Sequence, residues 1–111
     1  MLIKSFNGQN CFETEEKVNK WLNKQENINV INAVHRYNEG EGYNIIIQYQ
    51  AQKSLKKFFI KVFCSEIVVN TENTVNQWLE KNPDIEDLSM RYEIEHNNGL
   101  NTLLMFYSKK E

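Results

Sequence analysis

Two stretches of the chain carry apolar residues at the spacing of an amphipathic helix. The i, i+3, i+4 spacing, which places side chains on one buried stripe, occurs at Val18, Trp21 and Leu22 and again at Val75, Trp78 and Leu79. Thr14 and Thr71 precede these stripes and are predicted to be helix N-caps, because a side-chain oxygen there accepts from free backbone N–H groups. Pro83 cannot continue a helix, so the second helix is predicted to stop at about Asn82.

The remaining apolar segments have the length and pattern of β-strands. Residues 58–63 form a short apolar run with one Lys, and residues 88–95 alternate apolar and polar side chains, which is the period of a strand with one face in water. Turn-rich segments separate the last two strands of each half, as is typical of hairpins. The strands predicted in this way are 2–6, 31–37, 43–49, 58–63, 88–95 and 100–107. With the helices, the predicted order is β-α-β-β-β-α-β-β.

The two halves repeat one another. Residues i and i+57 are identical at thirteen positions between residues 1 and 44, and the motif Val-Asn-x-Trp-Leu-x-Lys occurs in both halves. Beyond Ile28 we expect the offset to drift, to 55 at Arg36 and to 58 at Tyr49, which gives the second half a longer hairpin. A unit of this size rarely buries enough apolar surface alone, so the two copies are expected to share one core.

These patterns predict a single α+β domain, residues 1–111, made of a tandem duplication of βαββ units at 1–51 and 58–108. The expected architecture is one antiparallel-rich sheet of about six strands with two helices on one face and an internal pseudo-twofold axis. Residues 58–62 and 103–107 are apolar on both strand faces, whereas the helices cover only one face. We therefore expect a homodimer whose interface contains Phe59, Phe63, Leu104 and Phe106.

Composition and charge exclude several classes. The net charge of −2 and the pI near 5.7 give no general attraction to nucleic acid or to anionic membranes. No stretch approaches the roughly 20 apolar residues of a membrane span, and no hydrophobic leader precedes the first strand, so we expect a cytoplasmic protein. Cys11 and Cys64 are the only cysteines, and no disulfide is expected. Lys53, Lys56 and Lys57 are expected to form a solvated connector.

Candidate catalytic chemistry is sparse. His35 and His96 are the only side chains that ordinarily titrate near neutrality, and neither is repeated in the other half. We expect His35 to be a hydrogen-bonded core residue and His96 to lie in a solvated turn. The two cysteines have neither the number nor the spacing of a metal site, and no phosphate-binding loop or nucleophile elbow occurs. The sequence therefore predicts no catalytic residue, no metal and no cofactor, and the protein is expected not to be an enzyme.

Polar residues that both halves keep are the candidates for binding. Lys4 and Lys61 lie between apolar neighbours on a strand, and Asn19 and Asn76 lie at the margin of the helical stripe. On one interpretation the lysine stems cover apolar surface while the amines reach water, and each Asn ties its helix to a strand. On the other, these four residues line a ligand-binding site across the pseudo-twofold axis.

The second half resembles a small family of sporulation proteins from spore-forming bacteria and their phages, in residues 60–63, 75–79 and 104–107. The resemblance implies one such unit per half and transfers no catalytic residue. Paired βαββ units are also similar to the tautomerase superfamily, whose base is an N-terminal proline, but this chain begins with Met1 and Leu2. The paired-module metal enzymes built from βαβββ units place His and Glu ligands on equivalent strands, a pattern that this chain lacks.

Three functional hypotheses follow. The first is a noncatalytic binding protein, such as a phage or mobile-element product that inhibits a host system by contact with a host protein, as anti-defence proteins do. The second is a small-ligand protein that binds or sequesters a nucleotide. The third is a structural protein of sporulation. Protein contact ranks first because the chain offers surfaces rather than an acid–base pair or an activated nucleophile.

Overall fold

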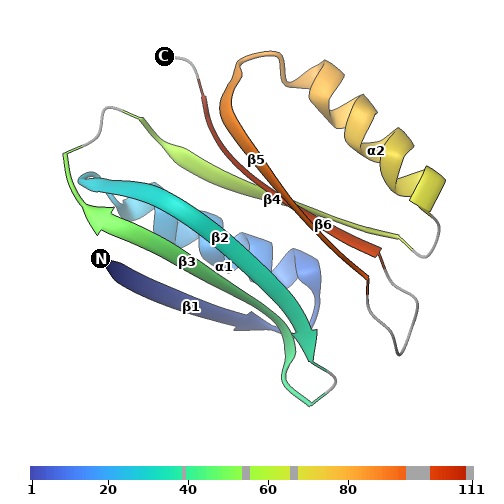
Figure 1. Ribbon diagram of the computed structural model, residues 1–111, viewed down its shortest axis with the longest axis horizontal. Helices are drawn as coiled ribbons and strands as arrows, with labels where there is room; N and C mark the ends of the chain where they lie inside the picture. The colour runs from blue at the N-terminus through green and yellow to red at the C-terminus, as the bar shows by residue number, and fades with distance from the viewer. Residues whose placement is uncertain (39, 54–55, 66–67, 95–100, 110–111) are drawn as a thin grey trace.

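The computed structural model describes residues 1–38, 40–53, 56–65, 68–94 and 101–109, which form two modules with the same order of elements. The first module consists of β1 (Leu2–Gly8), α1 (Cys11–Lys24), β2 (Ile28–Asn38) and β3 (Gly42–Ala51). The second consists of β4 (Phe58–Ser65), α2 (Val68–Lys81), β5 (Ile85–Ile94) and β6 (Asn101–Lys109). Figure 1 shows the first module at the lower left and α2 at the upper right. The α+β class and the predicted element order are confirmed.

Each module contains its own three-stranded antiparallel sheet, with strand orders β1-β3-β2 and β4-β6-β5. The prediction of one sheet of about six strands is therefore wrong. A continuous sheet would need an edge strand of one module to pair with an edge strand of the other, but β4 turns its free edge toward side chains of α1. Polar side chains there take the place of a neighbouring strand.

The two sheets have the same register. Leu2 is paired with Tyr49 in the first sheet, and Phe59 is paired with Tyr107 in the second. Equivalent residues are therefore 57 positions apart on β1 and β4 and 58 positions apart on β3 and β6, as expected at Tyr49. The helices also begin and end 57 positions apart. A residue of one module can thus be compared with its equivalent in the other.

The expected offset of 55 around Arg36 is wrong. Arg36 on β2 is paired with Asn44 on β3. The equivalent of Asn44 on β6 is Thr102, and Thr102 is paired with Glu93 on β5. Glu93 is therefore the equivalent of Arg36, and the offset between β2 and β5 remains 57. The local match of Arg36-Tyr37 to the Arg-Tyr pair at 91–92 misled the alignment. Both strands shift register at the same place, between residues 30 and 32 and between residues 86 and 89.

Both helices begin earlier than predicted. Asn10 is the N-cap of α1, and its side-chain oxygen accepts a hydrogen bond from the Glu13 N–H at 2.9 Å. Thr14 and Thr71 lie inside the first turn of their helices, so their assignment as N-caps is wrong. The end of α2 is as predicted, because the helix stops before Pro83.

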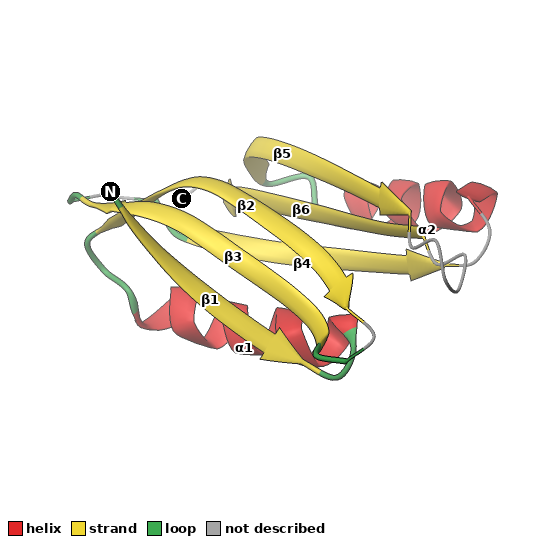
Figure 2. Ribbon diagram, turned by 60° about the horizontal axis from the view of Figure 1, so that its bottom comes forward, coloured by secondary structure: helices red, strands yellow, loops and turns green. Residues whose placement is uncertain are grey.

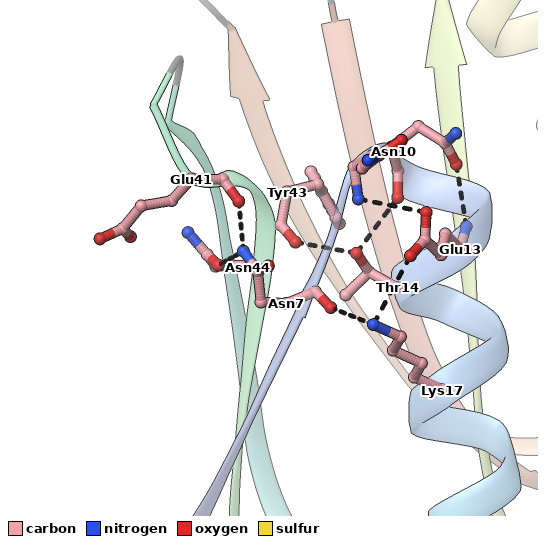
Figure 3. Close-up of polar contacts among 9 residues, drawn as sticks. Asn7, Asn10, Glu13, Thr14, Lys17, Glu41, Tyr43 and Asn44 are labelled. Atoms are coloured by element: carbon pink, nitrogen blue, oxygen red, sulfur yellow. Dashed lines mark hydrogen bonds and ion pairs between the residues drawn. The ribbon is translucent and has the colours of Figure 1, made fainter.

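Polar contacts fix α1 over the first sheet (Figure 3). The buried hydroxyl of Thr14 donates to the carbonyl oxygen of Tyr43 on β3 at 2.8 Å. The amine of Lys17 donates to the carbonyl oxygen of Asn7 on β1 at 2.8 Å, and the Asn7 side chain donates to Oδ1 of Asn44 at 2.6 Å. Because these contacts join α1 to both β1 and β3, they fix the rotation of the helix and therefore which of its side chains face away from the first sheet.

The predicted helical stripes are confirmed. Val18, Leu22 and Val75 are buried, and the two tryptophans pack edge-to-face in equivalent aromatic groups. The ring of Trp21 lies 5.7 and 5.1 Å from those of its two partners, and the ring of Trp78 lies 5.7 and 5.3 Å from those of its own. The partners are Phe6 and Tyr49 in the first module and Phe63 and Tyr107 in the second.

The second sheet lies between the first module and α2 (Figure 2). On one face, Phe63 and Met105 pack with Val75 of α2. The other face joins a core cluster shared by both modules, which includes Val18, Leu22, Ala33, Ile45, Ile47, Ile60, Val62, Leu104 and Phe106. The apolar face that the sequence assigns to a second subunit is therefore covered by the first module of the same chain.

The two modules are arranged head to tail. A pseudo-twofold axis would place α2 on β1 in the way that α1 lies on β4. In the described ranges, however, α2 packs on β4 and β6 of its own module. Figures 1 and 2 place β1 and α2 at opposite ends of the molecule. The contact between α1 and β4 is therefore made within the chain. The corresponding surfaces of α2 and β1 do not meet and are left open at the two ends of the molecule.

Candidate functional site

The contact between α1 and the free edge of β4, which we call the seam, is made by side-chain groups. The amide of Asn19 donates to the carbonyl oxygen of Ile60 at 3.0 Å, and its oxygen accepts from the Ile60 N–H at 2.9 Å. One side chain thus satisfies both backbone groups of an edge residue, as a paired strand would. The interpretation of Asn19 as a tie between helix and strand is confirmed.

Glu15 and Lys61 extend the seam by one turn of α1. Oε1 of Glu15 accepts from the Val62 N–H at 2.7 Å and lies 3.7 Å from Nζ of Lys61. Burial raises the pKa of Glu15 above its usual value, and the Val62 hydrogen bond and the Lys61 charge offset only part of that rise. The Lys61 amine also lies 5.7 Å from the centre of the Phe63 ring. Lys61 is therefore engaged within the chain.

Both ends of the seam also make contacts. At the C-terminus of α1, Nζ of Lys57 donates to the carbonyl oxygens of Asn23 and Gln25 at 3.3 and 3.1 Å, where a cation complements the helix dipole. At its N-terminus, Cys11 lies beside Cys64 of β4, with Cα atoms 7.3 Å apart. Lys57 is exposed, as expected of the connector, and it also contacts the end of α1.

Behind the seam, β4 fills a socket between α1 and the first sheet. The socket walls are Val18 on α1, Ala33 on β2 and Ile45 on β3, and all three are 0% exposed. Ile60 and Val62 of β4 belong to the same core cluster. A strand edge with two inward apolar side chains is therefore the natural filling of this socket.

The equivalent place in the second module is an open groove between α2 and β5. The groove has a volume of about 530 Å³ and is lined by Thr71, Glu72, Val75, Asn76, Leu79, Met90, Tyr92 and Leu103. Met90, the equivalent of the fully buried Ala33, is 55% exposed, and Tyr92 is 50% exposed. The groove is thus the socket of the second module, and no strand of the described residues fills it.

The free edge of β1 is the second open feature. β1 is at the edge of its sheet and pairs only with β3 in the described ranges. Leu2 and Ile3 are 51% and 66% exposed, whereas Ile60, the equivalent of Ile3, is 1% exposed. An unpaired strand edge with exposed apolar side chains is a template for association.

The structure separates the four predicted ligand-binding residues into two pairs. Asn19 and Lys61 meet in the seam. Lys4 on β1 and Asn76 on α2 are both exposed, and β1 and α2 lie at opposite ends of the molecule (Figure 1). The four residues therefore do not line one pocket within a chain.

The four predicted interface residues are mostly inside the chain. Leu104 and Phe106 pack against the first module, and Phe63 packs under Trp78. Phe59 is partly exposed and stacks on Tyr107 with a ring separation of 5.6 Å. Only Phe59 therefore has surface to offer a partner.

His35 has the environment expected of a core histidine. Its Nδ1 lies 2.6 Å from the hydroxyl of Tyr43. Burial lowers the pKa of His35 from its usual value, and a backbone contact with Arg91 offsets part of that effect. A cavity of about 170 Å³ adjoins the ring. His96 lies outside the described residues.

Groups of three or more His, Cys, Asp or Glu side chains that could hold a metal ion are not found among the described residues. Neither described helix is long and apolar enough to cross a membrane. Comparison with family models, curated proteins and solved structures gave no match to the chain.

Sequence analysis missed the groove although its signal was present. The alternation at Leu88, Met90 and Tyr92 predicts one buried strand face, yet these side chains are 38%, 55% and 50% exposed. Glu15 and Glu72 are also repeated residues, but the sequence placed them in the first turn of a helix, where the helix dipole favours a carboxylate; in the structure both lie beyond the first turn. A repeated acidic residue beside a repeated Asn is the pattern that marks both the seam and the groove.

Proposed function

We propose that the protein is a noncatalytic binding protein that acts by protein contact, and that its recognition site is the groove between α2 and β5. The observation that carries this proposal is the filled socket of the first module, where β4 occupies the equivalent position. A partner with an exposed strand edge fits such a site, because main-chain groups supply affinity and alternate side chains fill the apolar floor.

A defined probe tests strand binding. A peptide with the sequence of residues 57–65, carrying Cys64→Ser, is the strand that fills the first socket. It is expected to shift the amide resonances of Val75, Leu79 and Tyr92 and to leave those of the buried seam unchanged. Met90→Asp should abolish the shifts, because it places a charge on the apolar floor. Asn73→Asp, at an exposed position of α2 outside the groove, is the matched control.

A host partner is tested with the same variants. Proteins retained from a lysate of the native host by the wild type and by Asn73→Asp, but lost with Met90→Asp, would be partners of the groove. Retention by all three forms would place the contact elsewhere and contradict the proposal. Inhibition of a host system, including an anti-defence role, would then be examined with the identified partner.

Nucleotide binding is a second candidate, supported by a different cavity. A hollow of about 290 Å³ between the N-terminus of α1 and α2 is lined by residues that include Phe12, Lys61, Trp78 and Lys81. The lysines and aromatic rings of this lining suit an anionic ligand with a flat base. A thermal-shift screen with nucleotides tests it, since a ligand at a hundredfold its Kd adds about 2.7 kcal/mol to stability. Lys81→Ala should remove any such shift.

A further inference from the structure

We propose that the groove is filled by the free β1 edge of a second copy of this chain, so that molecules associate head to tail through an intermolecular version of the seam. This inference rests on the proposed function, because it names the partner of the same groove.

The three residues that make the polar contacts in the middle of the seam each have an identical equivalent that makes no such contact among the described residues. Glu15 corresponds to Glu72, Asn19 to Asn76 and Lys61 to Lys4. The edge residue Ile60 corresponds to Ile3. Glu72 and Asn76 line the groove, and Ile3 and Lys4 lie on the free edge. The two halves of a second seam are thus present in every molecule, at its two ends.

The shared register gives the contacts that a second seam would contain. The backbone groups of Ile60 point away from β6 toward Asn19, so those of Ile3 point away from β3. The Asn76 amide is therefore placed to bind the N–H and carbonyl of Ile3 in the next molecule. Glu72 would accept from the Ser5 N–H and face Lys4, as Glu15 accepts from Val62 and faces Lys61.

The apolar surfaces also correspond, with two differences that set the strength of the contact. Exposed Ile3 would enter beside exposed Met90 and Tyr92. However, the equivalent of Val62 is Ser5, and the equivalent of Phe106 in the core behind the seam is Gln48. The intermolecular seam would bury less apolar area than the intrachain one, so association is reversible and depends on concentration.

The geometry of this contact differs from that of the expected dimer. One molecule offers its groove and the other its β1 edge, so the contact is heterologous and leaves a groove and an edge free at the ends. Such contacts build rings or open chains. Glu72, Asn76 and Lys4 thereby have a partner in the assembly.

A mixing experiment tests the heterologous contact. Ile3→Asp disables only the edge, and Met90→Asp disables only the groove; both residues are exposed, so circular dichroism should show that both variants fold. In sedimentation velocity, the wild type is expected to gain mass with concentration and each variant alone to stay monomeric. An equimolar mixture should form a one-to-one dimer that grows no further, since only one intact edge and one intact groove remain.

A matched pair of helix variants tests the polar contact. Asn76→Ala is expected to weaken self-association at least tenfold, whereas Asn73→Ala on the same helix leaves it unchanged.

The outcomes separate this inference from the proposed function. A wild type that stays monomeric at its highest soluble concentration overturns head-to-tail association. If the 57–65 peptide still binds the groove in that case, the proposed function stands and the partner is a different protein. Mixed variants that remain monomeric although the wild type associates would show an isologous contact and also overturn the inference. Loss of peptide binding as well as association would remove both proposals.

Discussion

Asn19 and Asn76 occupy equivalent positions on α1 and α2, yet their surroundings differ. The Asn19 side chain makes two hydrogen bonds to a strand edge, and the residues behind it are buried by β4. Asn76 is exposed beside an apolar groove. The same residues in the same local structure therefore form a closed seam in one module and an open site in the other. What differs is the presence of a strand, and local sequence does not encode that.

Removal of apolar volume should show the largest difference between the two modules. Leu22 is 3% exposed in the filled socket, whereas its equivalent Leu79 is only partly buried at the groove. Leu22→Ala is expected to reduce the free energy of unfolding by about 3 kcal/mol, and Leu79→Ala by about 1 kcal/mol. Urea unfolding of dilute protein measures both. Equal losses would show that a strand also covers the groove under those conditions.

The second largest difference in the free energy of unfolding is expected between substitutions of the two equivalent asparagines. Asn19→Ala leaves the N–H and carbonyl of Ile60 without the side chain that binds them, and we expect a loss of about 2 kcal/mol. Asn76→Ala should change the stability of the monomer by no more than about 0.5 kcal/mol, because its side chain is exposed. Thermal and urea unfolding at low concentration are the measurements. A small effect at Asn19 would contradict the role assigned to it in the seam.

The lysines give a smaller contrast. Nζ of Lys61 lies 3.7 Å from a carboxylate whose side chain is only 15% exposed, so Lys61→Met should cost about 0.5 to 1 kcal/mol and less at high salt. Lys4→Met should leave the stability of the monomer unchanged and weaken only self-association. Measurements at two ionic strengths separate the effects. A cost at Lys4 in the monomer would indicate a contact within the chain.

The sequence predicted the modules well because each depends on local patterns. The helical stripes at Val18 and Val75 and the repeated Trp21 and Trp78 are short-range signals, and the structure confirms the elements they predict. The helix starts were misplaced because Thr14 resembles an N-cap, while its hydroxyl donates to the distant Tyr43 carbonyl.

The arrangement of the modules could not be predicted from the same patterns. Whether the apolar face containing Leu104 and Phe106 meets a subunit, a helix or the other module depends on long-range packing, and an apolar face does not specify what covers it. The groove could not be predicted for the same reason, because the pattern at Met90 and Tyr92 is that of ordinary buried residues on one face of a strand. The prediction of a single sheet was wrong for this reason.

The smallest expected effect is a pH dependence that arises at Glu15. Its pKa in the folded protein is raised by burial, so folding favours the protonated carboxyl relative to the unfolded chain. The resulting stabilisation is fully present at pH values below the unfolded pKa, near 4.5, and it is lost as pH rises through the raised folded value. Glu15→Gln keeps an oxygen that can accept from the Val62 N–H but does not titrate. The free energy of unfolding of the wild type minus that of Glu15→Gln should therefore fall as the pH rises through this window.

The matched substitution Glu72→Gln, on the exposed side of α2, controls for the loss of a negative charge without burial. Urea unfolding at closely spaced pH values from below 4.5 upward provides the differences. A difference for Glu15→Gln that rises with pH would show that the Val62 hydrogen bond and the Lys61 charge outweigh burial in the seam. If Glu72→Gln acquires the falling profile of Glu15→Gln only at protein concentrations where molecules associate, the groove has become a seam, because an added strand would bury Glu72 as β4 buries Glu15.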